Sequence, residues 1–480
     1  MYINHEEVCR LLEDGKNATR DDVLKILNKA REKNGISHRD IAVLLQLEDK
    51  ELLNEMFKVA GEIKKSIYGK RVVLFAPLYI SDFCVNNCVY CGYKKCNTFK
   101  RRKLTQDEIR EEVKILEKMG HKRLALELGE DPVNAPIEYV LESLDTIYKT
   151  QNENGNIRRV NVNIAATTVE NYKKLKEANI GTYILFQETY HKPTYEIMHP
   201  HSLKSSYEYH LNAFDRAMEG GIEDVGGGVL FGLADPKFEV LSLMMHNEHL
   251  EKKFGVGFHT ISVPRIRQAE GVTLENFPHL LSDEMFKKVV AIIRIAVPFT
   301  GIIMSTREDE EMRRDALKFG VTQVSSGSST GVGGYKQREE GKSIEQFKTS
   351  DERTPLEVLN WLLDEGYIPS YCTACYRKGR TGETFMGLAK SGEIQNMCEP
   401  NALMTLMEYA LDYGDKETCE KAEKLVNEEI IKINNEAIRK FVIEGIVKLK
   451  EGKRDIYESV KLIWKNSLIF HRIARSLKII

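Results

Sequence analysis

The sequence lacks the marks of several classes of protein. Its 70 basic and 72 acidic residues give a net charge of −2, so no excess of positive charge favours nucleic acid or an anionic membrane. No uninterrupted apolar run comes near the roughly 18 residues of a membrane-spanning helix, and the first residues form no signal peptide. We expect a cytoplasmic protein that binds neither nucleic acid nor membrane.

Cysteine is also sparse. Of nine cysteines in 480 residues, six fall into two groups of three, which is typical of metal ligands in a reducing compartment and not of a disulfide framework. The first group is Cys84, Cys88 and Cys91. Three thiolates can hold an iron–sulfur cube and leave its fourth iron open to a ligand that is not protein. Zinc is the alternative, but it needs four ligands and usually takes paired Cys-x2-Cys motifs.

The second group lies near the C-terminus and again offers three thiols: Cys372, Cys375 and Cys398. A second iron–sulfur cluster with one open iron is the functional interpretation, because such an iron could take a small substrate or a further metal. A structural zinc ion completed by a distant histidine is the alternative.

Short β-type segments alternate with amphipathic helical segments through the middle of the chain. The strands are predicted at Arg71–Ala76, Arg123–Leu128, Arg159–Ile164, Gly181–Phe186, Val225–Phe231, His259–Val263, Gly301–Met304 and Gln323–Ser325. The helices after the second strand are predicted at Ile137–Lys149, Val169–Ala178, Ser206–Glu219, Pro236–Phe254, Ser282–Ile295 and Asp309–Phe319. This order over roughly 260 residues predicts an α/β fold with a closed (β/α)8 barrel of the TIM type. A doubly wound open sheet is the rival.

The barrel is expected to span residues 71–335. Residues 1–70 have a helical pattern broken at Asn34-Gly35 and form an N-terminal helical extension. Residues 336–480 contain a helix near Pro355–Glu365, the second cysteine group, and two or three charged helices from Ala402 to the end. They are expected to form a helical, cluster-binding C-terminal region.

Polar residues follow the predicted strands around the whole ring, which favours the barrel because the active sites of such barrels lie at the carboxyl ends of the strands. The residues that follow the strands are Cys84 to Cys91, Gly129 and Glu130, Asn163, Gln187 and Glu188, Gly232, Arg265 and Arg267, Ser305 and Arg307, and Ser325 to Ser328. A glycine in this position lets the backbone approach a ligand closely, and an adjacent acid can hold an ammonium group.

The Cys-x3-Cys-x2-Cys spacing resembles the signature of the radical S-adenosylmethionine (SAM) superfamily. Taken with Gln187–Tyr190, Phe258–Arg265, Met304–Glu308 and the three C-terminal cysteines, the chain resembles the tyrosine lyases of that superfamily that mature FeFe-hydrogenase. A related lyase, the 2-iminoacetate synthase of the thiamine thiazole pathway, shares the barrel motifs and lacks the C-terminal cysteine group.

The resemblance implies two 4Fe-4S clusters and SAM as cofactors. It implies cleavage of L-tyrosine between Cα and Cβ to 4-methylphenol and dehydroglycine, which is converted to carbon monoxide and cyanide at the second cluster. It also implies a low-potential electron donor and hydrogenase-maturation proteins as partners. His259, at a strand start and so near the barrel floor, is implied as a ligand to an extra iron, with free cysteine as a further candidate ligand.

Site roles follow from the same resemblance. Gly129 and Glu130 resemble the Gly-Gly-Glu segment that binds the SAM amino group, with Leu128 in place of its first glycine, and Gly228 resembles the glycine-bearing strand beside the adenine. Asn163 and Arg265 are assigned with them to cofactor binding.

The substrate side of the site is assigned separately. Arg307 is the first candidate for the tyrosine carboxylate, because its planar fork suits a carboxylate, and Arg265 is the second. Gln187 and Glu188 are candidates to hold an amino or phenol group.

The two clusters are expected at opposite ends of the barrel, at least roughly 20 Å apart, since a strand of about six residues spans that length, with a tunnel between them. An iron–sulfur carrier without radical chemistry is an alternative of another class.

Overall fold

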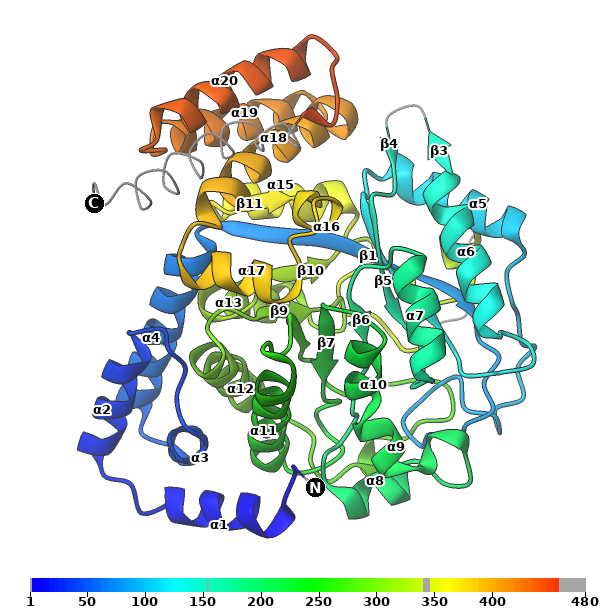
Figure 1. Ribbon diagram of the computed structural model, residues 1–480, viewed down its shortest axis with the longest axis vertical. Coiled ribbons are helices and arrows are strands. Elements are labelled where there is room, and N and C mark those ends of the chain that lie inside the picture. Colours follow the sequence, from blue (N-terminus) through cyan, green and yellow to red (C-terminus); the bar gives the residue numbers. More distant parts are fainter. Residues whose placement is uncertain (1, 153–154, 340–345, 457–480) are drawn as a thin grey trace, which may run out of the picture.

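Eight parallel strands close into a barrel (Figure 1). The computed structural model describes residues 2–152, 155–339 and 346–456. The barrel strands are β1 (Arg71–Ser81), β2 (Arg123–Leu128), β5 (Arg159–Asn163), β6 (Tyr183–Ile184), β7 (Val225–Gly228), β8 (Thr260–Ser262), β9 (Gly301–Met304) and β10 (Gln323–Ser325). Each pairs with the next, and β10 returns to β1 in the register Val73↔Gln323. The closure confirms the predicted TIM-type barrel and excludes an open sheet.

Helices cover the outside of the barrel between the strands: α5 (Gln106–Lys118), α6 (Ile137–Lys149), α7 (Val169–Glu177), α8 (Lys192–Met198), α9 (Tyr207–Leu211), α10 (Ala213–Glu219), α11 (Pro236–Phe254), α12 (Asp283–Ala296) and α13 (Glu310–Phe319). The predicted helix Ser206–Glu219 is two helices that meet at Asn212, and α8 was not predicted. A two-stranded hairpin of β3 (Gln151–Asn152) and β4 (Gly155–Asn156) follows α6.

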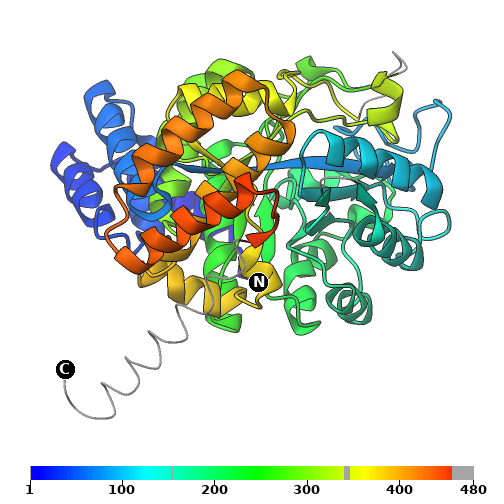
Figure 2. The ribbon, with the colours of Figure 1, turned by 90° about the horizontal axis from the view of Figure 1, so that it is seen from above.

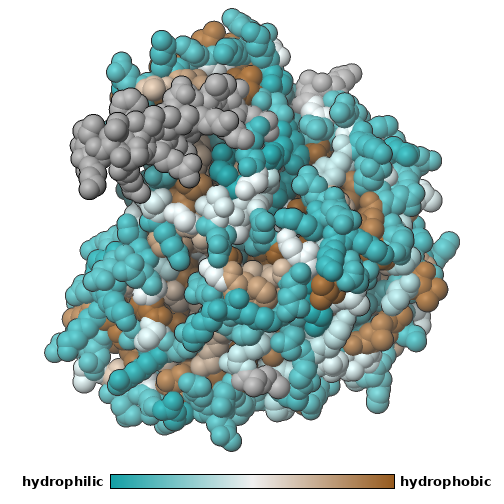
Figure 3. Space-filling model, viewed as in Figure 1, coloured by the Kyte–Doolittle hydropathy of each residue, from teal (hydrophilic) through white to brown (hydrophobic). Residues whose placement is uncertain are grey.

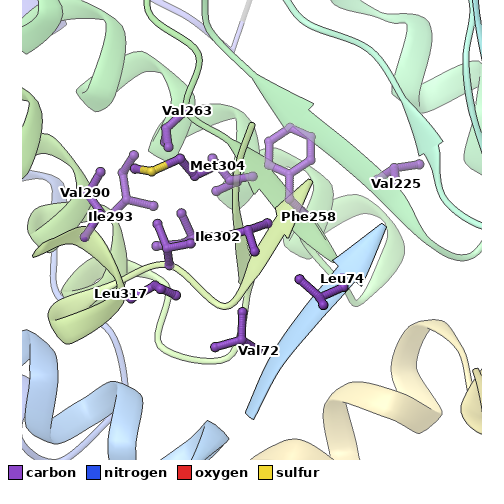
Figure 4. Close-up of a cluster of buried hydrophobic side chains, with 14 of the residues drawn as sticks. Val72, Leu74, Val225, Phe258, Val263, Val290, Ile293, Ile302, Met304 and Leu317 are labelled. Atoms are coloured by element: carbon purple, nitrogen blue, oxygen red, sulfur yellow. The ribbon is translucent and has the colours of Figure 1, made fainter. Parts of the chain in front are cut away.

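The core lies between the barrel wall and these helices. All four residues of β9 are buried, as expected for a parallel strand that is covered on both faces. Figure 4 shows side chains of α12 and α13 gathered against those of β9: Val290, Ile293, Leu317, Ile302 and Met304. Each side chain of this size contributes about 1.5–3 kcal/mol when buried, so this layer fixes the strand ends that carry the site.

Four helices precede the barrel: α1 (His5–Gly15), α2 (Arg20–Ala30), α3 (His38–Gln46) and α4 (Lys50–Tyr68). The last of them packs against α12 and α13 and leads directly into β1. At its end the Tyr68 hydroxyl donates to Phe299 O at 2.7 Å. The predicted N-terminal helical segment is therefore attached to the floor of the barrel.

The C-terminal region joins the barrel through a ninth strand that the sequence did not predict, β11 (Ile368–Ser370). It pairs in parallel with the first residues of β1, in the register Arg71↔Ile368 to Val73↔Ser370. The helices after the barrel are α14 (Gly334–Glu339), α15 (Pro355–Asp364), α16 (Ala374–Arg377), α17 (Gly382–Lys390), α18 (Gln395–Tyr413), α19 (Lys416–Ile430) and α20 (Glu436–Lys450). Of these, α15 and α18 pack against β11, whereas α14 packs against α5. The pairing of β11 with β1 places the second cysteine group at the barrel floor.

The last three helices form a layer outside the barrel (Figure 2). The helical segment predicted to run to the chain end reaches residues 457–480, which lie outside the described residues. Within the described part of the chain, no helix has the length and apolar character needed to cross a membrane. The face in Figure 3 is mostly hydrophilic, with scattered apolar patches.

Candidate functional site

A cavity of about 240 Å³ opens at the carboxyl ends of the barrel strands. It is lined by all three cysteines of the first group and by residues that follow the strands, including Glu130, Asn163, Glu188 and Arg307. The structure thus brings together the cysteine loop and much of the predicted polar rim at one end of the barrel.

Contacts with the end of β2 hold the cysteine loop in place. Val85 N donates to Glu130 O at 2.8 Å, and Asn86 Nδ2 donates to Glu130 Oε2. A Cβ atom at Gly129 would collide with Phe83 O, so only glycine lets the strand end approach the loop this closely. Gly129 and Glu130 therefore position the start of the cysteine loop, from Phe83 to Asn86.

The thiols of this loop sit in a buried setting. Burial raises the pKa of Cys88 to about 12 and that of Cys91 to about 11, and it raises the pKa of Cys84. Two N–H groups point at Cys91 Sγ, from Tyr93 N at 3.4 Å and from Gln346 Nε2 at 3.9 Å. Three converging thiols with N–H donors fit an iron–sulfur cluster, whose binding would drive off the thiol protons.

A row of polar side chains on β1, β2 and β5 lines one wall of the cavity. Tyr79 pairs with Glu127 between β1 and β2, and Glu127 pairs with Asn163 between β2 and β5. Asn163 Nδ2 donates to Glu127 Oε2 at 2.7 Å. Burial raises the pKa of Glu127 to about 8. Glu127 was missed from the sequence, although an acid inside the apolar strand Arg-Leu-Ala-Leu-Glu-Leu is the kind of signal that marks a functional site.

The two candidate arginines have different surroundings. The Arg307 guanidinium lines the cavity, lies 3.3 Å from the centre of the Phe347 ring, and has its pKa lowered by burial. Arg265 does not line the cavity, because its guanidinium is bonded to Glu308 and Asp283. The structure therefore offers Arg307, and not Arg265, to a ligand in the cavity.

The other predicted site residues also differ in whether they line the cavity. Glu188 lines the cavity and forms an ion pair with Lys204 at 2.7 Å. Its backbone φ is 67°, a value that is uncommon for residues other than glycine. Gln187 is buried but does not line the cavity. A Cβ at Gly228 would lie 2.8 Å from the Phe186 ring, so this glycine makes room for Phe186, which lines the cavity.

A second cavity, of about 120 Å³, lies at the opposite end of the strands. It is lined by the three cysteines of the second group and by His259, which precedes β8. The barrel therefore carries two separate three-cysteine sites. Gln323 of β10 lines both cavities, and among the described residues no other lining residue is common to them.

The three cysteines of the second group are half-buried and lie close to positive charge. A hydrogen bond between the Cys375 and Cys398 thiols raises the pKa of Cys375 and lowers that of Cys398, with Arg380 and Arg71 nearby. Arg123 Nη2 donates to Cys372 O at 3.1 Å. Paired thiols beside cations fit a thiolate-bound cluster.

His259 has both ring nitrogens near polar atoms. Its Nε2 lies 2.6 Å from the Tyr376 hydroxyl and its Nδ1 lies 3.4 Å from Asp224 Oδ1. Burial lowers the pKa of His259, which favours the neutral imidazole that binds metals. In the described part of the chain no three His, Cys, Asp or Glu side chains are arranged to hold a single metal ion; the thiolates of a cube each bind a different iron.

Comparison with known proteins shows where the chain belongs. Residues 78–241 match the model of the radical SAM superfamily, and residues 262–368 match that of the biotin and thiamin synthesis associated domain. A solved structure of HydG, a maturase of the [FeFe]-hydrogenase, is 55% identical, covers 95% of this chain and 99% of its own, and superposes with a TM-score of 0.93. The chain belongs to the HydG family. HydG from Carboxydothermus hydrogenoformans is 36% identical over 92% of this chain and 97% of its own, with a TM-score of 0.81.

A second relative is more distant. The 2-iminoacetate synthase of Salmonella typhimurium is 27% identical over 376 residues, which are 78% of this chain and 96% of that protein. Membership of the HydG family confirms the predicted class, a radical SAM tyrosine lyase, and implies one 4Fe-4S cluster with SAM. The residues present fit that cluster at Cys84, Cys88 and Cys91.

Proposed function

We propose that this chain cleaves L-tyrosine between Cα and Cβ to 4-methylphenol and dehydroglycine, and converts dehydroglycine to carbon monoxide and cyanide for assembly of the FeFe-hydrogenase H-cluster. The observation that carries the proposal is the pair of three-cysteine sites in two cavities of one barrel. The relatives named as [FeFe]-hydrogenase maturases support it, since they match nearly the whole chain.

The first site would start the reaction. Cys84, Cys88 and Cys91 would hold the first 4Fe-4S cluster, and with SAM bound this cluster supplies a 5′-deoxyadenosyl radical. The protein's part is to keep that chemistry away from water inside the barrel mouth. Gly129 and Glu130, which shape the cysteine loop, would face the SAM amino group.

Arg307 would hold the tyrosine carboxylate. Its guanidinium lines the cavity and makes a cation–π contact with Phe347, which fixes the plane of the fork and leaves its edges for a bidentate contact. A substrate fixed at this end would present its Cα–Cβ bond to the centre of the cavity.

The second site would complete the reaction. Cys372, Cys375 and Cys398 would hold an auxiliary 4Fe-4S cluster, and His259 would bind an extra iron, with free cysteine as a candidate additional ligand. Dehydroglycine would travel from one cavity to the other past Gln323. A low-potential electron donor and hydrogenase-maturation proteins are the partners that this reaction needs, and the cytoplasm is its expected location.

Product analysis of the anaerobically reconstituted protein with SAM, L-tyrosine and a strong reductant tests the proposal. We expect 4-methylphenol, carbon monoxide and cyanide from the unmodified chain, and 4-methylphenol without carbon monoxide from Cys398→Ala. Cys9→Ala, at an exposed thiol, is the matched control and should give all three products. If 4-methylphenol appears without carbon monoxide in every variant, the chain is a 2-iminoacetate synthase of the thiazole type; if 4-methylphenol is absent throughout, the substrate is wrong.

A further inference from the structure

The charges that line the first cavity are not all matched. Glu188 pairs with Lys204 at 2.7 Å, and Arg267 pairs with Glu308 at 2.8 Å. The Glu130 carboxylate accepts from Asn86 in the cysteine loop. Three charged side chains in the lining have no ion pair among the described residues, namely the acids Glu127 and Glu130 and the base Arg307. Glu130 is held by the cysteine loop and is assigned to the SAM amino group in the proposed function, so Glu127 and Arg307 are left for another ligand.

Glu127 is well placed to meet a ligand. It stands on β2 in the same row as Tyr79 and Asn163, with its side chain in the cavity. Asn163 bonds one carboxylate oxygen, and the described residues make no other side-chain hydrogen bond to the group. The Asn163 amide therefore orients the carboxyl group and leaves its second oxygen for a donor that the protein does not supply.

Arg307 lies close enough to influence the Glu127 carboxyl. The positive charge of Arg307 lowers the pKa of Glu127, while burial, the larger effect, raises it to about 8. An acid and a guanidinium that share one cavity without touching are costly to bury. A ligand with an ammonium group at one end and a carboxylate next to it would satisfy both.

We propose that Glu127 binds the ammonium group of the amino-acid substrate, so that with Arg307 on the carboxylate the cavity selects a zwitterionic α-amino acid. The inference rests on the proposed tyrosine chemistry and adds the residue that recognises the amine. Glu188 cannot serve equally, because its carboxylate is already bonded to Lys204.

Binding measurements on the anaerobically reconstituted holoenzyme with SAM and without reductant test this assignment. The probes are L-tyrosine, 3-(4-hydroxyphenyl)propanoate, which lacks the amine, and tyramine, which lacks the carboxylate. Glu127→Gln keeps the shape of the side chain and removes its charge. A hydrogen bond to a charged group contributes about 1.5–3 kcal/mol, so we expect Glu127→Gln to weaken tyrosine and tyramine roughly ten- to hundredfold and to leave the propanoate within about twofold.

Two variants complete the design. Glu127→Asp keeps the charge and should restore part of the preference for tyrosine over the propanoate. Glu112→Gln alters a buried carboxyl on α5, outside the cavity, and should change no affinity. An unchanged preference in Glu127→Gln would overturn the assignment, as would an equal loss for all three probes. A holoenzyme that makes no 4-methylphenol would instead overturn the proposed function, so the two failures are distinguishable.

Discussion

The hydroxyl of Tyr376 lies 2.6 Å from Nε2 of His259. Tyr376 directly follows Cys375, so this contact joins the second cysteine group to the start of β8. The Tyr376 ring also faces Arg159, whose guanidinium lies 2.7 Å from the ring centre. An iron ion bound at Nε2 would have to replace the tyrosine hydroxyl.

Tyr376→Phe should therefore strengthen binding of the extra iron. The variant keeps the ring beside Arg159 and removes only the competing hydroxyl. Since a hydrogen bond of this kind contributes about 0.5–1.5 kcal/mol net, we expect up to roughly tenfold tighter iron binding at the second site, measured by competition with a chelator, and unchanged 4-methylphenol formation. Weaker iron binding in the variant would show that the hydroxyl supports the site and does not compete with the metal.

Gly129→Ala should damage the first site. The added methyl group would meet Phe83 O and push the cysteine loop away from β2. We expect the variant to lose most of the iron of the first cluster and most of its SAM binding. Iron analysis measures the first loss, and the change in the cluster's EPR spectrum on addition of SAM measures the second. Gly387→Ala is the control, because no atom lies within 4 Å of the position that its added methyl group would take, and alanine there should favour helix α17 by about 0.5–1 kcal/mol. Equal SAM binding by both variants would contradict the role of Gly129.

Gln323 allows a test of passage between the cavities. A larger side chain, Gln323→Phe, should obstruct the junction, while Gln323→Asn should keep it open. We expect the phenylalanine variant to form 4-methylphenol but little carbon monoxide, and to release glyoxylate and ammonia, because dehydroglycine that escapes is hydrolysed by water. Carbon monoxide at the level of the asparagine variant would show that the small product takes another route.

The fold could be predicted closely where local signals were strong. The bounds of β2, β9, β10, α6 and α11 agree with the structure. The strand β9 is continuously apolar and α6 is amphipathic, while α11 has clear end signals, since Asp235 and Pro236 begin it and Gly255 ends it. The strand β11 was not predicted, since three residues that include Pro369 carry no strand pattern and gain their conformation only by pairing with β1. Tertiary pairing, invisible in local sequence, also extends β1 to Ser81.

The candidate site could be predicted in its chemistry more than in its contacts. The two cysteine groups were evident from spacing alone. Arg265 and Arg307 look alike in sequence, and only the neighbours of Arg265, Glu308 and Asp283, show that its charge is already matched. Glu127 enters the site through the register between β1, β2 and β5, a relationship that a single sequence does not contain.

A buried lysine on α4 gives a pH-dependent prediction away from the site. Lys64 donates to Leu317 O of α13 and lies 4.7 Å from the centre of the Tyr367 ring. Burial lowers its pKa to about 7, with Arg294 nearby adding to the effect. The unfolded chain keeps this amine charged up to about pH 10.4, so the folded state binds its proton less well, and the cost of the buried charge is greatest below pH 7.

The effect of Lys64→Met on the stability of the folded protein should therefore be more favourable at low pH than at high pH. Below pH 7 the variant avoids the buried charge and should melt at or above the temperature of the unmodified protein. As pH rises from 7 towards 10, the cost of the buried charge in the unmodified protein falls by up to about 1.4 kcal/mol per pH unit. The variant still lacks the hydrogen bond to Leu317 at every pH. The melting temperature of the unmodified protein should therefore rise relative to that of the variant as pH increases. The control Lys65→Met alters an exposed lysine on the same helix and should show no such shift. If the difference in melting temperature between Lys64→Met and the unmodified protein stays constant from pH 6 to pH 10, Lys64 is neutral, or hydrated, throughout.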